Sequence, residues 1–89
     1  ENITPAKLEQ IELGEALLHR LGFRQCRVRH HGNIARIEVP ADEIERLVEQ
    51  HLRKTILDYF QSLGFIYTAV DMRGYLSGSM NMALKKENL

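Results

Sequence analysis

The chain has few residues that could stabilise it through disulfide bonds or a bound metal, and it carries no net charge. It has one cysteine, Cys26, no tryptophan and two prolines among its 89 residues. A single cysteine excludes an internal disulfide framework and a cysteine-based zinc site. Twelve basic and twelve acidic side chains cancel, which excludes a generally basic surface for nucleic acid. No apolar run approaches the roughly 18 residues of a membrane span, so we expect neither nucleic acid nor a membrane as a partner.

The apolar and charged fractions of the sequence are typical of one small folded domain. Apolar residues make up 44% of the chain and charged residues 27%, which are ordinary values for a globular protein. Single domains usually contain about 50 to 250 residues, so two independent cores do not fit. Residues 1–89 are therefore predicted to form a single α+β domain, ordered over about residues 3–84.

A helix is predicted over residues 4–21. Thr4 is a favourable N-cap, and Pro5 suits the first helical position, where its missing N–H costs nothing. Apolar residues then recur near helical spacing as far as Leu21, and Gly22 is well placed to end the helix.

Residues 25–39 predict a β-hairpin whose strands flank Gly32 and Asn33. Glycine at the first loop position suits a primed two-residue turn, because it accepts a positive φ freely. In this register one face carries Cys26, Val28, His30, Ala35, Ile37 and Val39. The other face carries Arg27, Arg29, Arg36 and Glu38, with His31 and Ile34 near the turn. A slip of one residue would destroy this separation of apolar and charged faces.

The remainder of the chain predicts a second helical region and a third strand. An apolar stripe of helical period follows Pro40 as far as Leu63, as one long helix or as two with a break near His51. Residues 65–70 form a nearly continuous β-favouring run, which predicts a strand that is buried on both faces or central. The predicted order is α-β-β-α-β, a small three-stranded mixed sheet with the helices packed on one face and the arginine face uncovered.

The strongest candidate site is a cluster of arginines. Between His19 and Arg36 there is no acidic residue, and the segment carries Arg20, Arg24, Arg27, Arg29 and Arg36. Arg29 lies opposite Arg36 in the predicted register, and like charges so placed destabilise a sheet. An anion between them would remove this penalty, because guanidinium groups bind phosphate or sulfate through paired hydrogen bonds. Arg27 could reach the same site or pair with Glu38, and His31 could join it; the alternative is a solvated strand face.

Three further features of the sequence are candidates for a functional site. His30 and His31 point to opposite faces of a strand, so they are not expected to chelate one metal, and His30 is predicted to be half-buried and hydrogen-bonded. Cys26 lies on the inward face and is predicted to be an inert, packed thiol. The loop after the last strand could cradle an anion through its backbone amides, or be a plain surface loop. Its candidate contacts are Asp71, Ser77, Gly78, Ser79 and Asn81.

No catalytic machinery is visible in these residues. The chain does not bring together a nucleophile, a base and an orienting group, so neither a triad nor a carboxylate pair is predicted. The glycine-containing loop lacks the pattern of a nucleotide P-loop.

Two sequence blocks resemble the ATP-dependent sacrificial sulfur transferases of the PP-loop ATP pyrophosphatase superfamily, including those that act in nickel-pincer cofactor biosynthesis. The first block is RVRHHGNIARIEVP, residues 27–40, and the second is the GF–strand–Asp–GY–SGSMN ending, residues 64–81. The opening residues 3–23 are similar to the helix that precedes the RVR strand in that family. The chain departs from the family pattern at Leu76 and Met82.

The resemblance implies the C-terminal domain of a longer cytoplasmic enzyme. In such enzymes an N-terminal PP-loop domain uses ATP and Mg to adenylate a substrate carboxylate, and a cysteine then gives up its sulfur. No Ser-Gly-Gly-x-Asp-Ser motif occurs here, so the chain alone is expected to hold no cofactor and no catalytic residue. Cys26 does not match the position of the sulfur-donating cysteine.

The resemblance also implies partners and ligands. The arginines of the family's RVR motif look like ligands for a phosphate-bearing small-molecule substrate, and they match Arg27 and Arg29. The N-terminal PP-loop domain of the same protein and further copies in a homo-oligomer are the expected protein partners. The alternative is a free-standing ligand-sensing or protein-interaction module that dimerises through its open sheet face.

Overall fold

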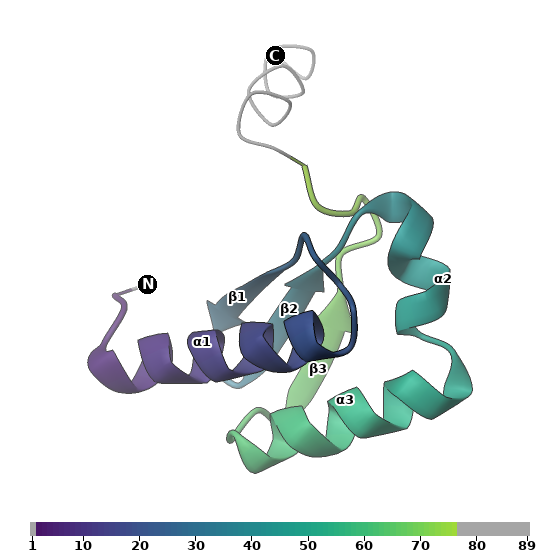
Figure 1. The fold of residues 1–89 in the computed structure, drawn as a ribbon. Coiled ribbons are helices and arrows are strands. Elements are labelled where there is room, and N and C mark those ends of the chain that lie inside the picture. Colours follow the sequence, from purple (N-terminus) through teal and green to yellow (C-terminus); the bar gives the residue numbers. More distant parts are fainter. Residues whose placement is uncertain (1, 77–89) are drawn as a thin grey trace.

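The computed structural model describes residues 2–76. Its elements run in the order α1 (Pro5–Arg20), β1 (Arg27–His31), β2 (Ile34–Glu38), the 3-10 turn η1 (Ala41–Glu43), α2 (Ile44–Leu47), α3 (Gln50–Ser62) and β3 (Tyr67–Val70) (Figure 1). The three strands form one sheet in the order β1-β2-β3. Strand β1 is antiparallel to β2, and β3 is parallel to it, so the predicted mixed α+β sheet is confirmed.

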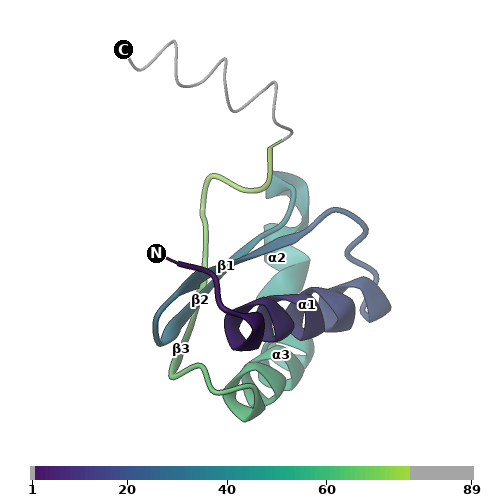
Figure 2. The ribbon, with the colours of Figure 1, turned by 90° about the vertical axis from the view of Figure 1, so that its left-hand side faces the viewer.

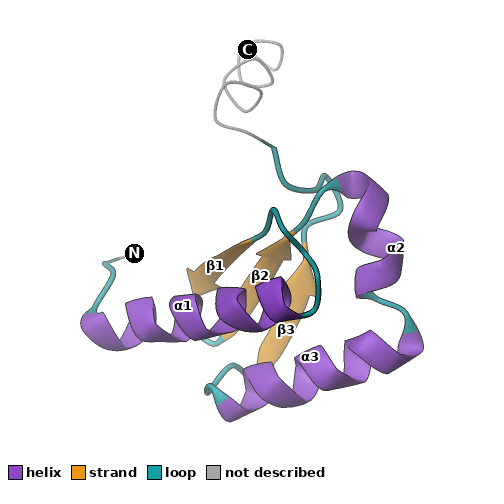
Figure 3. Cartoon of the chain, viewed as in Figure 1, coloured by secondary structure: helices purple, strands orange, loops and turns teal. Residues whose placement is uncertain are grey.

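The helices gather on one side of the sheet. Figures 2 and 3 show α1 and α3 side by side against one face, while the opposite face has no covering element among residues 2–76. The core lies between these two layers and includes Leu18, Phe23, Ala35, Ile37, Val39 and Phe60. At Gly14 the helices approach closely, because a Cβ there would lie 2.9 Å from the Phe60 ring. None of the described helices combines the length and hydrophobicity that a bilayer crossing requires.

Thr4 caps the start of α1 by accepting a hydrogen bond from the amide of Lys7 at 3.2 Å, as predicted. The two long helices, α1 and α3, both end at a glycine. After α1 and α3, Gly22 and Gly64 adopt φ values of +98° and +109°, which L-residues rarely adopt. In each case the next residue is a phenylalanine with at most 2% exposure. Each glycine therefore ends a helix and turns the following side chain into the core.

The hairpin has the predicted register. Arg29 pairs with Arg36 and Val28 with Ile37, and Gly32 adopts a φ of +60°. Only the first loop residue has a positive φ, which identifies the turn as type II′. Val28 and Ile37 are buried, so the apolar face of the hairpin faces the helices.

The helical region after Pro40 is broken rather than continuous. Helix α2 ends at Leu47 and α3 begins at Gln50, a little before the position near His51 at which a break was considered. Glu49 has an extended backbone between them, and its carboxylate accepts a hydrogen bond from the amide of Leu52. An N-cap carboxylate thus starts α3 as a separate helix.

The prediction for the third strand was wrong in one respect. Strand β3 is an edge strand of four residues, and one of its faces is exposed rather than buried. Tyr67 is 64% exposed, and only the side chains that alternate with it face the helices. The apolar run is longer than the strand because Phe65 lies in the connection after α3, where its amide bonds back to the Phe60 carbonyl and its side chain packs in the core.

Candidate anion-binding site

The uncovered face of the sheet carries three rows of side chains, one at each matched position of the strands. The hairpin row is His31, Ile34 and Tyr67, and the middle row is Arg29, Arg36 and Ala69. The last row is Arg27 and Glu38, and Asp71 follows directly after the end of β3. The face is therefore partly apolar at the hairpin end and charged at the opposite end. Alternation along strands explains the arrangement, because the residues between these positions point into the core.

Glu38 lies between the two arginines of the middle row. It is only 7% exposed, and its Oε2 accepts hydrogen bonds from Arg29 Nε at 3.4 Å and from Arg36 Nη2 at 3.3 Å. This carboxylate offsets the repulsion between Arg29 and Arg36 from within the chain. The alternative pairing of Glu38 with Arg27 is not formed among residues 2–76.

Asp71 adds a second carboxylate to the charged end. Its Oδ2 lies 3.8 Å from Arg36 Nε and 3.9 Å from Arg73 Nη2, and its Oδ1 accepts a hydrogen bond from the Arg73 amide at 2.9 Å. This candidate loop contact therefore balances arginine charge, and its own charge would repel an anion. Arg36 Nε is buried and has no hydrogen-bond acceptor within the described chain.

Arg27 has a different environment from the other two arginines. Its side chain is exposed, and no ion pair to a carboxylate is found for it in residues 2–76. Its guanidinium carbon lies over the Tyr75 ring, 5.9 Å from the centroid. A hydrogen bond with the Tyr75 side chain is the largest cause that raises the pKa of Arg27. Arg27 is thus a permanent cation held beside an aromatic ring, with most of its donors unused.

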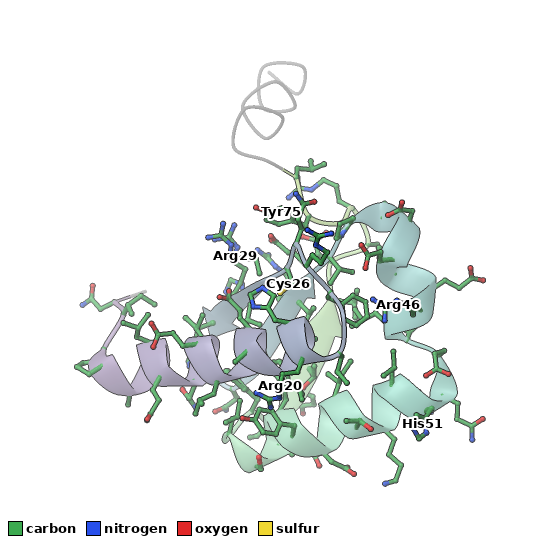
Figure 4. All side chains as sticks on the ribbon, viewed as in Figure 1. Arg20, Cys26, Arg29, Arg46, His51 and Tyr75 are labelled. Atoms are coloured by element: carbon green, nitrogen blue, oxygen red, sulfur yellow. The ribbon has the colours of Figure 1, made fainter. Side chains whose placement is uncertain are left out.

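Tyr75 was not among the residues selected from the sequence. The turn at 71–74 places it beside β2, where its amide donates a hydrogen bond to the Val39 carbonyl at 2.7 Å. Gly74 makes this approach possible, since its φ is +91° and a Cβ there would lie 2.9 Å from the Ala41 nitrogen. The sequence signal that could have identified Tyr75 is a glycine directly before an aromatic residue, shortly after a strand. Figure 4 shows Tyr75 near the end of the sheet where the chain leaves β3.

The structure brings together only some of the predicted arginines. Arg27, Arg29 and Arg36 share the open face, whereas Arg20 lies in the last turn of α1 and Arg24 lies in the loop before β1. His31 is on the same face but in the apolar row, two positions along the strand from Arg29, or about 6.6 Å. The anion-site candidates therefore converge on three arginines, with His31 at a distance.

Cys26, directly before β1, and His30, within it, are the two residues near this strand that were considered separately from the arginines. Burial, together with the nearby Glu15 carboxylate, raises the pKa of the Cys26 thiol to about 11. The thiol is therefore protonated at neutral pH and is a poor nucleophile, in agreement with the prediction of an inert cysteine. His30 is half-buried and hydrogen-bonded to Gln10 at 2.8 Å, also as predicted.

Four predicted loop contacts lie outside the described residues: Ser77, Gly78, Ser79 and Asn81. Within residues 2–76, no three His, Cys, Asp or Glu side chains are grouped so that they could hold a metal ion.

The fold and this face together define a small α+β domain with one uncovered, arginine-bearing sheet face. The chain is 41% identical over 86 residues to an uncharacterised protein of Synechocystis sp.. It is 39% identical over 87 residues to the pyridinium-3,5-bisthiocarboxylic acid mononucleotide synthase of Lactiplantibacillus plantarum. These matches cover 97% and 98% of the chain but only 32% and 31% of the relatives. The chain thus spans about a third of the length of these curated relatives, and no protein-family model matches it.

Proposed function

We propose that this chain is the C-terminal, substrate-binding domain of a PP-loop, ATP-utilising sulfur transferase. The similarity to a synthase of a bisthiocarboxylic acid mononucleotide supports this proposal, because such a product contains both sulfur and a phosphate group. The limited coverage of the relatives is consistent with one domain of a larger protein. ATP and Mg would bind to the N-terminal PP-loop domain, and the sulfur would come from a cysteine outside this chain.

The role of this domain is to bind the anionic part of the substrate through Arg27, Arg29 and Arg36. The observation that carries this proposal is the exposed Arg27 guanidinium, which has no carboxylate partner in the described chain. Arginine forms paired hydrogen bonds with phosphate and stays charged at any physiological pH. Arg29 and Arg36 contribute positive potential next to Arg27, although Glu38 already occupies part of their donors.

Titration with inorganic phosphate, followed by amide and arginine side-chain NMR, tests this role. We expect shifts at Arg27 and its neighbours on the open face, and binding that weakens with added salt. Nicotinic acid mononucleotide is a second probe, since it joins a phosphate to a pyridinium ring. Arg27→Ala should lower the phosphate affinity roughly tenfold or more, because charge-assisted hydrogen bonds are lost.

Arg24→Ala is the matched control, because Arg24 is an exposed arginine that lies off the open face. It should leave phosphate binding unchanged. Equal losses in the two variants, or shifts that avoid the open face, would contradict the proposed site. ATP hydrolysis to AMP and pyrophosphate by the purified chain alone would contradict the assignment to a non-catalytic domain.

We further propose that the hairpin end of the open face serves oligomer contacts. Ile34 and Tyr67 are neighbours in the register and are 38% and 64% exposed, so two large side chains present apolar surface together at this end of the face. Sedimentation equilibrium of the wild-type chain and of Tyr67→Lys tests this contact. A dimer that Tyr67→Lys disrupts, in a chain that does not bind phosphate, would favour the interaction-module alternative instead.

A further inference from the structure

The charged end of the open face consists of two unlike halves. In one half, Arg29 and Arg36 share the Glu38 carboxylate, and Asp71 lies close to Arg36. In the other half, Arg27 adjoins an aromatic ring and no ion pair to a carboxylate is found for it in the described chain. An anion entering the first half must compete with carboxylates of the protein. In the second half it meets a guanidinium to which no carboxylate of the described chain is bound directly, although Glu15 and Glu38 act on its charge from farther away.

The backbone around Tyr75 is anchored to the sheet. The amides of Asp71 and Tyr75 bond to the Ile37 and Val39 carbonyls at 2.9 and 2.7 Å, so the turn between them is attached to β2 at both ends. Inside the turn, the Gly74 amide bonds to the Asp71 carbonyl at 3.1 Å. These contacts hold the Tyr75 backbone in register with the sheet. They thereby fix the point from which the Tyr75 side chain extends to Arg27.

We propose that Tyr75 is the positioning residue of the anion site, which orients the Arg27 guanidinium on the open face so that it binds the incoming oxyanion. This inference rests on the proposed function of the arginine cluster. The Tyr75 ring lies beside the guanidinium, and a hydrogen bond with the Tyr75 side chain is the main cause that raises the pKa of Arg27. Since Arg27 is exposed and forms no ion pair to a carboxylate within residues 2–76, donors of its guanidinium remain available to a phosphate.

The physical benefit is preorganisation. A free arginine side chain samples many rotamers and loses that freedom when it binds a ligand. A guanidinium already held by a tyrosine loses less on binding, so its affinity for an anion is higher. The cation–π contact also favours the position over the ring without neutralising the charge. A carboxylate in the place of Tyr75 would hold Arg27 equally well but would compete with the anion.

The test compares Tyr75→Phe and Tyr75→Leu with the wild-type chain in titrations with inorganic phosphate. Tyr75→Phe should weaken binding roughly two- to tenfold, because one hydrogen bond to Arg27 is lost. Tyr75→Leu should weaken it further, because the ring is lost as well. Tyr59→Phe is the matched control, since Tyr59 lies in α3, away from the open face, and should not affect the affinity.

A double variant shows whether Tyr75 acts through Arg27. In the Arg27→Ala background, adding Tyr75→Phe should cause no further loss of phosphate affinity, because the two residues act as a unit. Additive losses would overturn the proposal, since they would mean that Tyr75 contacts the anion directly or acts by another route. Wild-type affinity in Tyr75→Phe, with the Arg27→Ala loss intact, would also overturn it while leaving the proposed function in place.

A measurement on the ligand-free chain separates the positioning role of Tyr75 from the proposed anion-binding function. The Arg27 Nε–Hε group should give a large heteronuclear NOE in the free wild-type chain and a reduced one in Tyr75→Phe. Thermal unfolding of the two proteins controls for a purely structural effect and should be similar. If the wild-type chain does not bind phosphate, the proposed function fails. An Arg27 side chain that is equally mobile in both proteins would refute the positioning role by itself.

Discussion

Arg29 and Arg36 face each other across the hairpin and share one buried carboxylate, while Arg27, on the same face, adjoins a tyrosine. Glu38 offsets part of the charge of the first pair and so contributes to the stability of the sheet. The second arrangement leaves a positive charge directed at solvent. The same residue type on one sheet face thus has two different roles, and the partner that tertiary structure supplies decides between them.

A substitution in the turn that carries Tyr75 should have the largest effect of those that test this comparison. Gly74→Ala should lower the free energy of unfolding by about 2–4 kcal/mol, because alanine is strained at φ +91° and its Cβ would lie 2.9 Å from the Ala41 nitrogen. Phosphate binding at Arg27 should weaken at the same time. Urea unfolding and phosphate titration measure both effects.

Gly32→Ala provides the control for backbone strain alone. Gly32 has a φ of +60°, but nothing lies within 4 Å of the position of its Cβ. The expected loss is about 1 kcal/mol, without an effect on phosphate binding. Equal losses at Gly74 and Gly32 would mean that the close packing of Gly74 against β2 contributes nothing to stability.

Removing the Glu38 carboxylate should make the surroundings of Arg29 and Arg36 more like those of Arg27. Glu38→Gln leaves Arg29 and Arg36 opposite each other without a negative charge between them, so stability should fall by about 1–3 kcal/mol. The affinity for phosphate should rise, because an external anion no longer competes with Glu38. Chemical unfolding in the presence and absence of phosphate measures both consequences.

Glu43→Gln is the comparison variant for Glu38→Gln, because Glu43 forms a more exposed ion pair with Arg46 at 3.2 Å. Its loss should cost less than about 1 kcal/mol. A Glu38→Gln variant that matched Glu43→Gln in stability and bound phosphate no better than wild type would refute the assigned role of Glu38.

The smallest effect is expected on the inward side of β1, at Cys26. The folded chain holds the Cys26 pKa at about 11, above its ordinary value of 9.0, mainly through burial. Between these pH values the unfolded chain releases the proton while the folded chain retains it, so this residue makes stability fall as the pH rises from about 9 to 11. Below pH 9 the thiol is protonated in both states and has no such effect.

Cys26→Ala should remove this component of the pH dependence. Urea midpoints of the two proteins, compared at several pH values from 8 to about 11, isolate it from the tyrosines and lysines that titrate in the same range. Parallel curves would show that Cys26 titrates alike in both states. Rapid alkylation of the folded chain at neutral pH would also contradict the raised pKa.

Much of the fold could be predicted because its signals are local. Thr4 and Pro5 predicted where α1 begins, and the glycine turn with alternating side chains predicted the register of the hairpin correctly. The third strand was predicted over residues 65–70 and occupies 67–70, and it is an edge strand rather than one that is central or buried on both faces. An apolar run does not reveal whether a strand lies at an edge, because that depends on which neighbours the topology provides.

The candidate site could be predicted only in part for the same reason. The pattern of one strand face correctly grouped Arg27, Arg29 and Arg36. The partner of each arginine could not be read from it, because Glu38 was within reach of all three. Tyr75 contacts Arg27 from a distant part of the chain, so no spacing rule connects them.

By itself, the sequence determined the helix ends, the hairpin register and the gathering of three arginines on one face, because caps, turns and alternation act between residues close along the chain. Only the tertiary structure decided that Glu38 joins Arg29 and Arg36, that β3 lies at an edge, and that the turn at Gly74 brings Tyr75 to Arg27. These outcomes depend on the path that the chain takes around the core, and that path is set by the packing of all its elements together.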